Sequence, residues 1–474
     1  MQISQRQRKY YLYVLIFFVL LLGAFQGPGS KKVGWHGLLS IRLTHPAALR
    51  ARSSLRLRRK EGKIFSFHPL CGSREGWPAQ QCRGEYNAPA TSLKFFFPNI
   101  APPYYLSTIM KLAQLTAYLE SLAPLAYQED YDNSGLIVGQ PDMEVSQALI
   151  SLDCTEAVVD EAIATGCQVI ISHHPIVFKG LKKFNSNTYI ERVVEKAIRS
   201  HIALYAIHTN LDNMMMGVNA RICETLGLTN TRILAPKQNL LKKLVTYVPI
   251  AQAEQVRKAL FHAGAGHIGE YSEVSFNAEG TGTFKGSENS DPYVGEPGIR
   301  HHEAEMRIET IYPANLESKI IMALVLAHPY EEVAYDLYNL TNQHQQIGSG
   351  MIGELEIPVD EAEFLGEVKT AMDCTMIRHT AFTGKRVKKV AVCGGSGGFL
   401  LKHAIAAGAD VFVTADYKYH EFFDAEGKIV IADIGHFESE QFTQQLLCEI
   451  IQEKFVNFAI RLTKVNTNPV KYFI

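Results

Sequence analysis

Two adjacent histidines, His173 and His174, come directly after the apolar stretch Gln168–Ser172. A short apolar stretch bounded by polar residues predicts a buried strand, so the pair would lie at a strand end. Adjacent imidazoles in an extended segment project in different directions, and they could serve two metal ions or clamp one. Paired histidines are also common on protein surfaces, so this pair alone is only weak support for a metal site.

Two further stretches repeat this arrangement. Ala203–Ile207 predicts the next strand, and it is followed by His208 and Asp212. Near the C-terminus, His436 and Glu440 are four residues apart at a predicted helix start, which places both side chains on one helical face. A carboxylate together with imidazoles is a ligand set that suits zinc, manganese or iron.

These stretches are expected to converge because each follows a strand of an α/β arrangement. In an open α/β sheet, ligands bind outside the carboxyl ends of the strands. Unrelated surface residues would instead scatter over both edges of the sheet. The predicted metal ligands are His173, His174, Asp212, His436 and Glu440.

Asp416 and His420 follow a further predicted strand, Val411–Thr414, at the same edge. They are candidates for orienting a metal ligand or for transferring a proton. His420 fits equally well as a cap at the start of the next helix. The role of His208 is left open in the same way: it could be a metal ligand, an orienting residue or a general acid or base.

A glycine loop, with Gly394, Gly395, Ser396 and Gly397, joins a predicted strand to a helix. Loops of this kind let backbone N–H groups approach a phosphate or another anion near a helix N-terminus. The loop lacks the lysine and the spacing of a P-loop, and it does not match GxGxxG. Close packing of backbone at the rim of the site is the alternative interpretation.

The elements that must position these residues divide the chain into segments. Residues 110–238 and 343–474 alternate short apolar stretches with helical ones, which predicts a two-part α/β domain with a parallel sheet. Residues 239–342 change to the order β-α-β-β-α-β, which predicts an inserted ferredoxin-like α+β module. The predicted fold class is therefore α/β, with the metal-binding residues in the two-part domain.

Residues 1–109 differ from the rest in composition. They hold 16 Lys and Arg against three acidic residues, a net charge of +13, so the remainder carries −14 although the whole chain carries −1. Tyr10–Phe25 resembles a secretory signal or short anchor, but it is shorter than the roughly 20 residues of a bilayer-spanning helix. Because Met110 opens an amphipathic helix, we expect the basic leader to be a mispredicted start.

Six cysteines after Met110 are scattered, without CxxC pairs or the spacing of a disulfide framework. This pattern is typical of thiols in a reducing compartment, so a cytoplasmic protein is predicted. If the chain starts at Met110, no membrane association is expected. An acidic protein of this kind is also not expected to keep a stable nucleic-acid partner.

From Met110 to its end, the chain resembles the GTP cyclohydrolase 1 type 2 homolog family, also called NIF-three-like. The motifs that carry this resemblance are the double histidine, the segments 130–136, 208–212, 393–398, 418–420 and 435–440, and the closing Asn468-Pro469. The insert, with its segment 328–332, resembles the longer bacterial members, whose central module is similar to PII and CutA-type proteins.

The resemblance implies a dinuclear site for divalent cations at the five ligand positions, and a ring-shaped homohexamer built from trimers whose sites face a cavity. The metal would be zinc, iron, manganese or cobalt. The implied function is a metal-dependent hydrolase that uses an activated water on a nucleotide-like substrate such as GTP, or a phosphoesterase acting on a nucleotide. The alternative is a non-catalytic metal-binding or regulatory assembly, in which the insert gates the ring or binds an effector.

Overall fold

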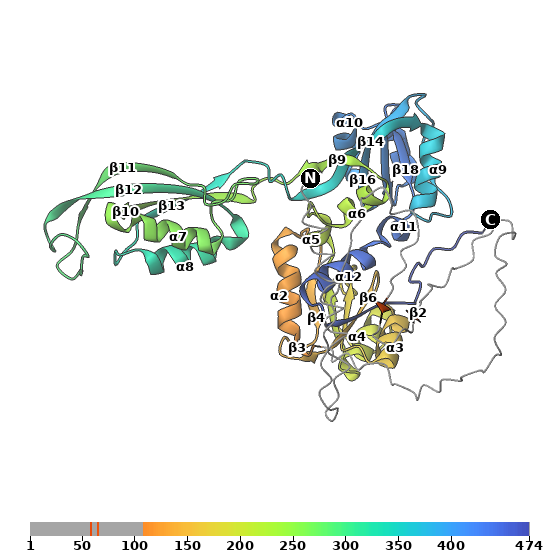
Figure 1. The fold of residues 1–474 in the computed structure, drawn as a ribbon, viewed down its shortest axis with the longest axis horizontal. Coiled ribbons are helices and arrows are strands. Elements are labelled where there is room, and N and C mark those ends of the chain that lie inside the picture. The colour runs from red at the N-terminus through yellow and green to blue at the C-terminus, as the bar shows by residue number, and fades with distance from the viewer. Residues whose placement is uncertain (1–56, 59–63, 66–107, 474) are drawn as a thin grey trace. The chain divides into compact units, whose positions relative to one another are not determined.

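The structure is a computed structural model, and it describes residues 57–58, 64–65 and 108–473 (Figure 1). The apolar run Tyr10–Phe25 and most of the basic leader lie outside the described residues. Within the described part, no helix has the length and apolar character needed to cross a membrane.

The chain divides into two compact units, Met1–Phe96 and Phe97–Ile474. In the first unit, β1 (Leu57–Arg58) and β2 (Ile64–Phe65) form an antiparallel pair. The second unit holds all the other described helices and strands.

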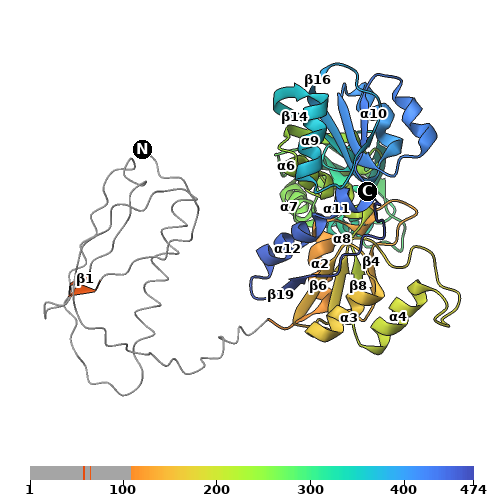
Figure 2. The same ribbon diagram turned by 90° about the vertical axis from the view of Figure 1, so that its right-hand side faces the viewer.

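A five-stranded sheet with the order β19-β6-β7-β8-β4 belongs to the first α/β half (Figure 2). β19, β6, β7 and β8 are parallel, whereas β4 is antiparallel to β8. The strands are β4 (Gly135–Val138), β6 (Gln147–Ser151), β7 (Val169–Ser172), β8 (Ala203–Ala206) and β19 (Ala459–Leu462). β7 and β8 are buried along their whole length, which explains their continuous apolar sequences.

Helices cover both faces of this sheet. α3 (Glu156–Thr165) and α4 (Tyr189–Arg199) pack on one face in a core that includes Ile170 of β7. α2 (Leu112–Leu122) packs on the opposite face in a core that includes Ile171. Successive residues of β7 therefore anchor the two layers of helices, as the alternation of side chains along a strand requires.

A six-stranded sheet with the order β15-β18-β17-β16-β14-β9 belongs to the second half. β16, β17 and β18 are parallel, and the other neighbouring pairs are antiparallel. The strands are β9 (Thr229–Pro236), β14 (Gly348–Asp360), β15 (Arg378–His379), β16 (Arg386–Ser396), β17 (Val411–Ala415) and β18 (Val430–Asp433). One hydrophobic core contains both Ile171 of the first sheet and Val413 of the second, so it joins the two halves.

The remaining helices of the two halves vary in length from α5, with four residues, to α12, with 12. The helices are α5 (Thr209–Asp212), α6 (Val218–Thr225), α9 (Glu361–Ala371), α10 (Leu401–Ala406), α11 (His436–Glu440) and α12 (Thr443–Lys454). The strands β3 (Met110–Lys111) and β5 (Glu144–Val145) pair next to α2. The 3-10 helices are η2 (Leu125–Tyr127), η3 (Ile250–Gln252), η4 (Ala314–Leu316), η5 (Gly398–Leu400) and η6 (Tyr419–Ala425).

A separate four-stranded antiparallel sheet with the order β11-β12-β10-β13 lies between the two halves in sequence. Its elements are β10 (Leu241–Pro249), α7 (Ala253–Ala263), β11 (Phe276–Lys285), β12 (Arg300–Pro313), α8 (Glu317–Ala327) and β13 (Tyr335–Leu340). The two helices share one hydrophobic core with β10 and β12. This segment therefore has a core of its own.

Candidate metal centre

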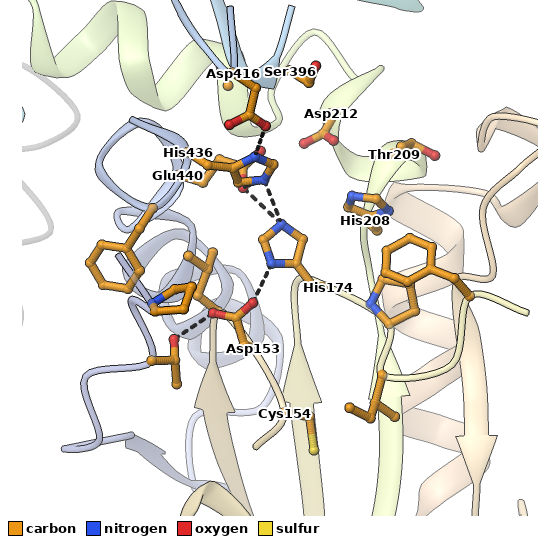
Figure 3. Close-up of a pocket in the computed structure, with 18 of the residues that line it drawn as sticks. Asp153, Cys154, His174, His208, Thr209, Asp212, Ser396, Asp416, His436 and Glu440 are labelled. Carbon is orange, nitrogen blue, oxygen red and sulfur yellow. Dashed lines mark hydrogen bonds and ion pairs between the residues drawn. The ribbon is translucent and has the colours of Figure 1, made fainter. Parts of the chain in front are cut away.

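The predicted ligands follow the carboxyl ends of strands in two different sheets. His173 and His174 come directly after β7, and α5 follows β8. α11 follows β18 of the other sheet. The sequence predicted one common sheet edge. The structure instead lets the strand ends of two sheets meet at one cluster, where the side chains point toward one another (Figure 3).

Glu440 lies at the centre of the cluster. Its Oε2 is 3.0 Å from Nε2 of His174 and 3.2 Å from Nε2 of His436, and these two nitrogen atoms are 3.3 Å apart. Nε2 of His173 is 3.8 Å from Oε1 of Glu440 and 3.5 Å from Oδ1 of Asp212. The five residues thus form two groups that share Glu440, one with His174 and His436 and the other with His173 and Asp212. His173 and His174 also form a third group of possible metal ligands with His208.

Three buried polar atoms of the cluster have no hydrogen-bond partner within the described part of the chain, apart from the ion-pair contacts given above. They are Nε2 of His173, whose side chain is fully buried, Oδ1 of Asp212 and Oε2 of Glu440. Leaving a buried polar atom unpaired costs roughly 1–3 kcal/mol. Imidazole nitrogen and carboxylate oxygen are the atoms that bind zinc and similar divalent cations. The donor set therefore fits a divalent metal.

The Nδ1 atoms that face away from the cluster are each held by an acceptor. Nδ1 of His173 is 2.8 Å from a backbone carbonyl oxygen. Nδ1 of His174 is 2.8 Å from Asp153, and Nδ1 of His436 is 2.6 Å from Asp416. Acceptors in these positions favour the Nδ1–H tautomer and leave Nε2 as the ligand atom. Asp416 thus lies where the sequence predicted an orienting residue.

Neighbouring carboxylates increase the proton affinity of two histidines of the cluster, His174 and His436. Burial alone would lower the pKa of His174, but hydrogen bonds to Asp153 and Glu440 raise it to about 9. At His436 burial is likewise outweighed, and Asp416 and Glu440 raise the pKa to about 11. Burial raises the pKa of Glu440, yet the surrounding histidines hold it well below its usual range. A metal must therefore compete with protons for these nitrogen atoms.

His208 borders the cluster and is held by a buried carboxylate, Asp132. Oδ1 of Asp132 is 2.8 Å from Nδ1 of His208, and its Oδ2 accepts hydrogen bonds from the backbone N–H and the hydroxyl of Thr209. Burial opposes ionisation of Asp132, but these hydrogen bonds hold its pKa well below the usual range. The His208 ring centroid is 5.2 Å from that of His173, so a fixed imidazole stands beside the cluster.

The predicted anion loop is packed against the cluster. The backbone N–H groups of Gly394, Gly395 and Gly397 already donate, at 2.9 to 3.1 Å, to the side-chain oxygens of Asn219, Ser439 and Thr414 respectively. Gly395 has φ of +61°, and a Cβ there would lie 2.5 Å from Oε1 of Glu440. Ser396 and Gly394 line the pocket. These contacts favour close packing at the rim over anion binding.

His420 lies apart from the cluster. It belongs to η6, where its exposed ring is 5.1 Å from Tyr419 and 6.4 Å from Phe423 between centroids. The residue that caps η6 is Lys418, and His420 is not among the residues that line the pocket. The structure therefore does not bring His420 to the predicted ligands, and its role in proton transfer stays a prediction.

The cluster lines a pocket with a volume of about 1340 Å³. Lys179, Lys182 and Lys183, on the connection between β7 and α4, line the same pocket. All three are exposed, and none forms an ion pair with a described residue. Phe178 and Phe399 also line the pocket, with 47% and 66% of their surfaces exposed. The pocket thus combines a metal-type cluster with cationic and aromatic walls.

Two residues of the site, Asp132 and Asp153, were not predicted. Asp153 follows β6 by two residues, so it has the signal that identified His173 and His208, a polar side chain just beyond a parallel strand. Asp132 precedes the antiparallel strand β4, and the rule of carboxyl strand ends does not reach it. Its position in the segment 130–136, which carries the family resemblance, was the only available signal.

The chain is similar to one protein family over most of its length. The family model of Duf34/NIF3 (NGG1p interacting factor 3) matches residues 110–469. The chain is 39% identical over 359 residues to the GTP cyclohydrolase 1 type 2 homolog of Halalkalibacterium halodurans, which covers 74% of this chain and 96% of the relative. It is 39% identical over 366 residues to the Bacillus subtilis homolog, which covers 76% and 98%.

Solved structures agree with this assignment. The Bacillus cereus protein related to NIF3 matches with a TM-score of 0.67 and 41% identity, and the match covers 77% of this chain and 100% of that protein. Staphylococcus aureus protein SA1388 matches with a TM-score of 0.63 and 30% identity, covering 77% and 99%. The region matched by the family model includes the whole histidine and carboxylate cluster. The chain belongs to the Duf34/NIF3 family.

Proposed function

We propose that the protein is a dinuclear metal-dependent hydrolase that acts on a nucleotide-like substrate. The observation that carries this proposal is the pair of ligand groups that share Glu440, one with His174 and His436 and the other with His173 and Asp212. Each group offers three ligand atoms, which leaves positions for water and substrate around a cation. Zinc, iron, manganese and cobalt all suit this donor set.

Divalent cations bound here would lower the pKa of a coordinated water to about 7 and polarise the substrate. The chain itself supplies orientation and proton transfer. Asp153 and Asp416 hold the imidazoles of His174 and His436 in place. His208 is the group that takes up and delivers a proton, because Asp132 binds its Nδ1 and leaves Nε2 for the exchange.

The walls of the pocket support a phosphate-bearing substrate with a planar ring. Lys179, Lys182 and Lys183 have no carboxylate partner in the described part of the chain, so their charges are available to an anion. Phe178 and Phe399 offer exposed aromatic faces on which a base can stack. We therefore assign phosphate recognition to the lysines, with the glycine loop as the rim on which Glu440 packs.

Turnover of GTP and a panel of nucleotides by the metal-loaded protein tests the proposal. GTP comes first because the curated relatives carry the name GTP cyclohydrolase 1 type 2 homolog. His173→Ala and Glu440→Gln are expected to abolish turnover together with bound metal, whereas Lys402→Gln, an exposed change on α10 outside the pocket, leaves both intact. Turnover that survives both ligand changes would contradict a metal-dependent reaction.

A non-catalytic metal-binding or regulatory assembly is the alternative, and the insert favours it. We propose that this segment is a ferredoxin-like module, because its elements follow the order β-α-β-β-α-β around an antiparallel sheet. It also has a pocket of its own, with a volume of about 780 Å³. Tightly held metal with no turnover of any nucleotide in the panel would favour this alternative.

We further propose that the protein forms a homo-oligomer, a toroidal hexamer. Exposed apolar side chains on α8 and β13 support an interface with a second copy, and they are Met322, Val325, Leu326, Leu337 and Tyr338. Sedimentation analysis of the purified protein checks the assembly. A monomer at micromolar concentration would contradict it.

A cytoplasmic location is proposed from the thiols. In the part of the chain that the structure describes, the six cysteines are free and buried. Burial raises the pKa of Cys154 and of Cys223 to about 12, so these thiols stay protonated and unreactive. Fractionation of cells that express the native gene checks the location.

A further inference from the structure

A second pocket lies within the insert, and none of its lining residues belongs to the metal cluster. It is lined by the hairpin β11–β12, by the connection between these two strands, and by the segment that follows α8. Its volume of about 780 Å³ is in the range of small-molecule binding sites. The residues of this pocket identify the chemistry of its ligand.

A buried carboxylate, Glu305 of β12, lines the pocket. Only 7% of its surface is exposed. Its Oε1 accepts a hydrogen bond of 2.7 Å from the hydroxyl of Tyr330, whereas its Oε2 has no hydrogen-bond donor among the described residues. Oε2 is not among the buried polar atoms without a partner, so it stays accessible, and a donor or a cation in the pocket can contact it. Glu305 is therefore suited to a ligand that donates or carries positive charge.

The opposite strand leaves room for this carboxylate. Glu305 pairs with Gly280 across β11 and β12, and Gly282 lies two residues further along β11. A Cβ on Gly282 would lie 2.0 Å from Oε2 of Glu305. The absence of a side chain on Gly282 thus allows the carboxylate to lie over β11, at the wall of the pocket.

Three aromatic rings, those of Tyr330, Phe284 and Tyr293, line the pocket together with Glu305, and Tyr330 is the ring residue hydrogen-bonded to it. The Tyr330 ring centroid is 5.9 Å from that of Phe284 and 6.4 Å from that of Tyr293. Tyr330 is fixed by its backbone N–H, which donates to Nδ1 of His328, while Nε2 of His328 donates to the carbonyl oxygen of Tyr247. Burial lowers the pKa of His328, which agrees with this neutral ring. The aromatic wall is therefore held in place before any ligand arrives.

The remaining charges of the pocket are mainly negative. Glu279, Glu331 and Glu332 line it, against two basic residues, Lys285 and Arg307. Arg307 is already paired with a carboxylate, at 2.8 Å. Among the described residues, the carboxylates of this pocket do not form a group of metal ligands, and such groups occur at the Glu440 cluster. The pocket therefore suits an organic cation better than a metal ion.

We propose that this pocket binds a small organic ammonium compound, with its cationic nitrogen between Glu305 and the rings of Tyr330 and Tyr293. Aromatic faces attract such cations through the charge distribution of their rings, and a carboxylate completes the site. This site is independent of the proposed hydrolase reaction, so either can fail without the other.

Binding of choline and of its neutral isostere 3,3-dimethyl-1-butanol tests the charge requirement. The two probes have nearly the same shape, so titration calorimetry with the full metal-loaded chain isolates the contribution of the positive charge. Choline is expected to bind at least about tenfold more tightly than the isostere. Equal affinities, or no choline binding at millimolar concentration, would overturn the proposal.

Matched variants test the residues. Glu305→Gln keeps the shape of the side chain and is expected to weaken choline binding at least about tenfold. Glu270→Gln, an exposed change outside the pocket, is expected to leave it unchanged. Because a change at the buried Glu305 can also disturb folding, two variants of Tyr293 give an independent test. Tyr293→Phe is expected to keep the affinity for choline, whereas Tyr293→Leu is expected to weaken it about threefold or more. Unchanged affinity in both Glu305→Gln and Tyr293→Leu would refute the site.

Discussion

The metal pocket and the pocket of the insert each contain a buried glutamate, and the neighbours of these two glutamates differ. Glu440 lies within 4 Å of a ring nitrogen in each of three histidines. Glu305 is hydrogen-bonded to one hydroxyl group, that of Tyr330, and shares its pocket with aromatic rings. Imidazoles around a carboxylate make a site for metal cations, whereas aromatic rings around a carboxylate favour organic cations. The same side chain thus takes its ligand chemistry from what surrounds it.

Removing the negative charge of each glutamate in turn is the strongest test of this comparison. Glu440→Gln removes the carboxylate that both ligand groups share, so we expect the protein to lose both metals. Elemental analysis of freshly purified protein measures this directly. Glu305→Gln is the matched control, and it is expected to keep the full metal content while it loses choline binding. Equal metal content in the two variants would mean that Glu440 is not a ligand.

Gly395→Ala is expected to have the next largest effect. The new Cβ would lie 2.5 Å from Oε1 of Glu440, at a residue whose φ is +61°, so the carboxylate must move. We expect a loss of about 1–3 kcal/mol in the free energy of unfolding, and weaker metal binding. Gly398→Ala is the control, because the nearest atom to its Cβ is 3.7 Å away. Thermal unfolding with and without metal compares them, and equal behaviour would contradict the proposed packing.

The clustering of the predicted ligands could be expected from the sequence because His173 and His174 follow a short, fully buried strand. The apolar stretch before His173 and His174 predicts a strand that is buried on both faces. The stretch Ala203–Ile207, before His208, predicts a second strand of the same kind. The i, i+4 spacing of His436 and Glu440 was enough to predict that both side chains lie on one face of a helix. Local pattern was sufficient wherever one element positions the side chain.

Local pattern failed where distant strands pair. β19, at the C-terminus, adds to β6 of the first sheet, and β9, from the first half, pairs with β14 of the second. The periodicity of a single segment does not show which distant strand it pairs with. The sequence therefore predicted one sheet with one common edge, whereas the structure has two sheets that meet at the cluster. Asp132 was missed for the same reason, since its contact with His208 spans 76 residues.

Asp132→Asn separates proton transfer from metal binding. The uncharged amide is a weaker acceptor for Nδ1 of His208 than the carboxylate is, so it orients the imidazole less well. We therefore expect kcat to fall by about 10²-fold. Metal content should stay unchanged, because Asp132 is in no ligand group and its partner His208 is outside the two groups that share Glu440. Steady-state kinetics over a range of pH, with elemental analysis, measures both. A variant that loses metal would show instead that His208 is a ligand, and an unchanged kcat would remove it from the mechanism.

The two pockets are also expected to differ in pH dependence. In the metal-free protein His174 has a pKa of about 9 and His436 of about 11, so both are protonated at pH 7 and must release protons to bind a cation. Metal affinity should therefore rise with pH, by up to about tenfold per pH unit for each proton released. Competition with a chelator between pH 6 and 8 measures this slope, and a flat profile would contradict it. Choline affinity should not follow the same slope.

The smallest effect is expected from the lysines of the metal pocket. Lys182→Gln combined with Lys183→Gln removes two charges from the pocket wall but no ligand, so metal content should not change. If these lysines hold a phosphate, KM rises roughly threefold to tenfold with little change in kcat, since exposed charges contribute modestly. High salt should remove the difference in KM between the variant and the unchanged protein, because exposed charges are screened.

Lys402→Gln, exposed on α10, is the control. A KM that stays unchanged at low salt would remove phosphate recognition from this wall, and the aromatic faces of Phe178 and Phe399 would then have to hold the substrate.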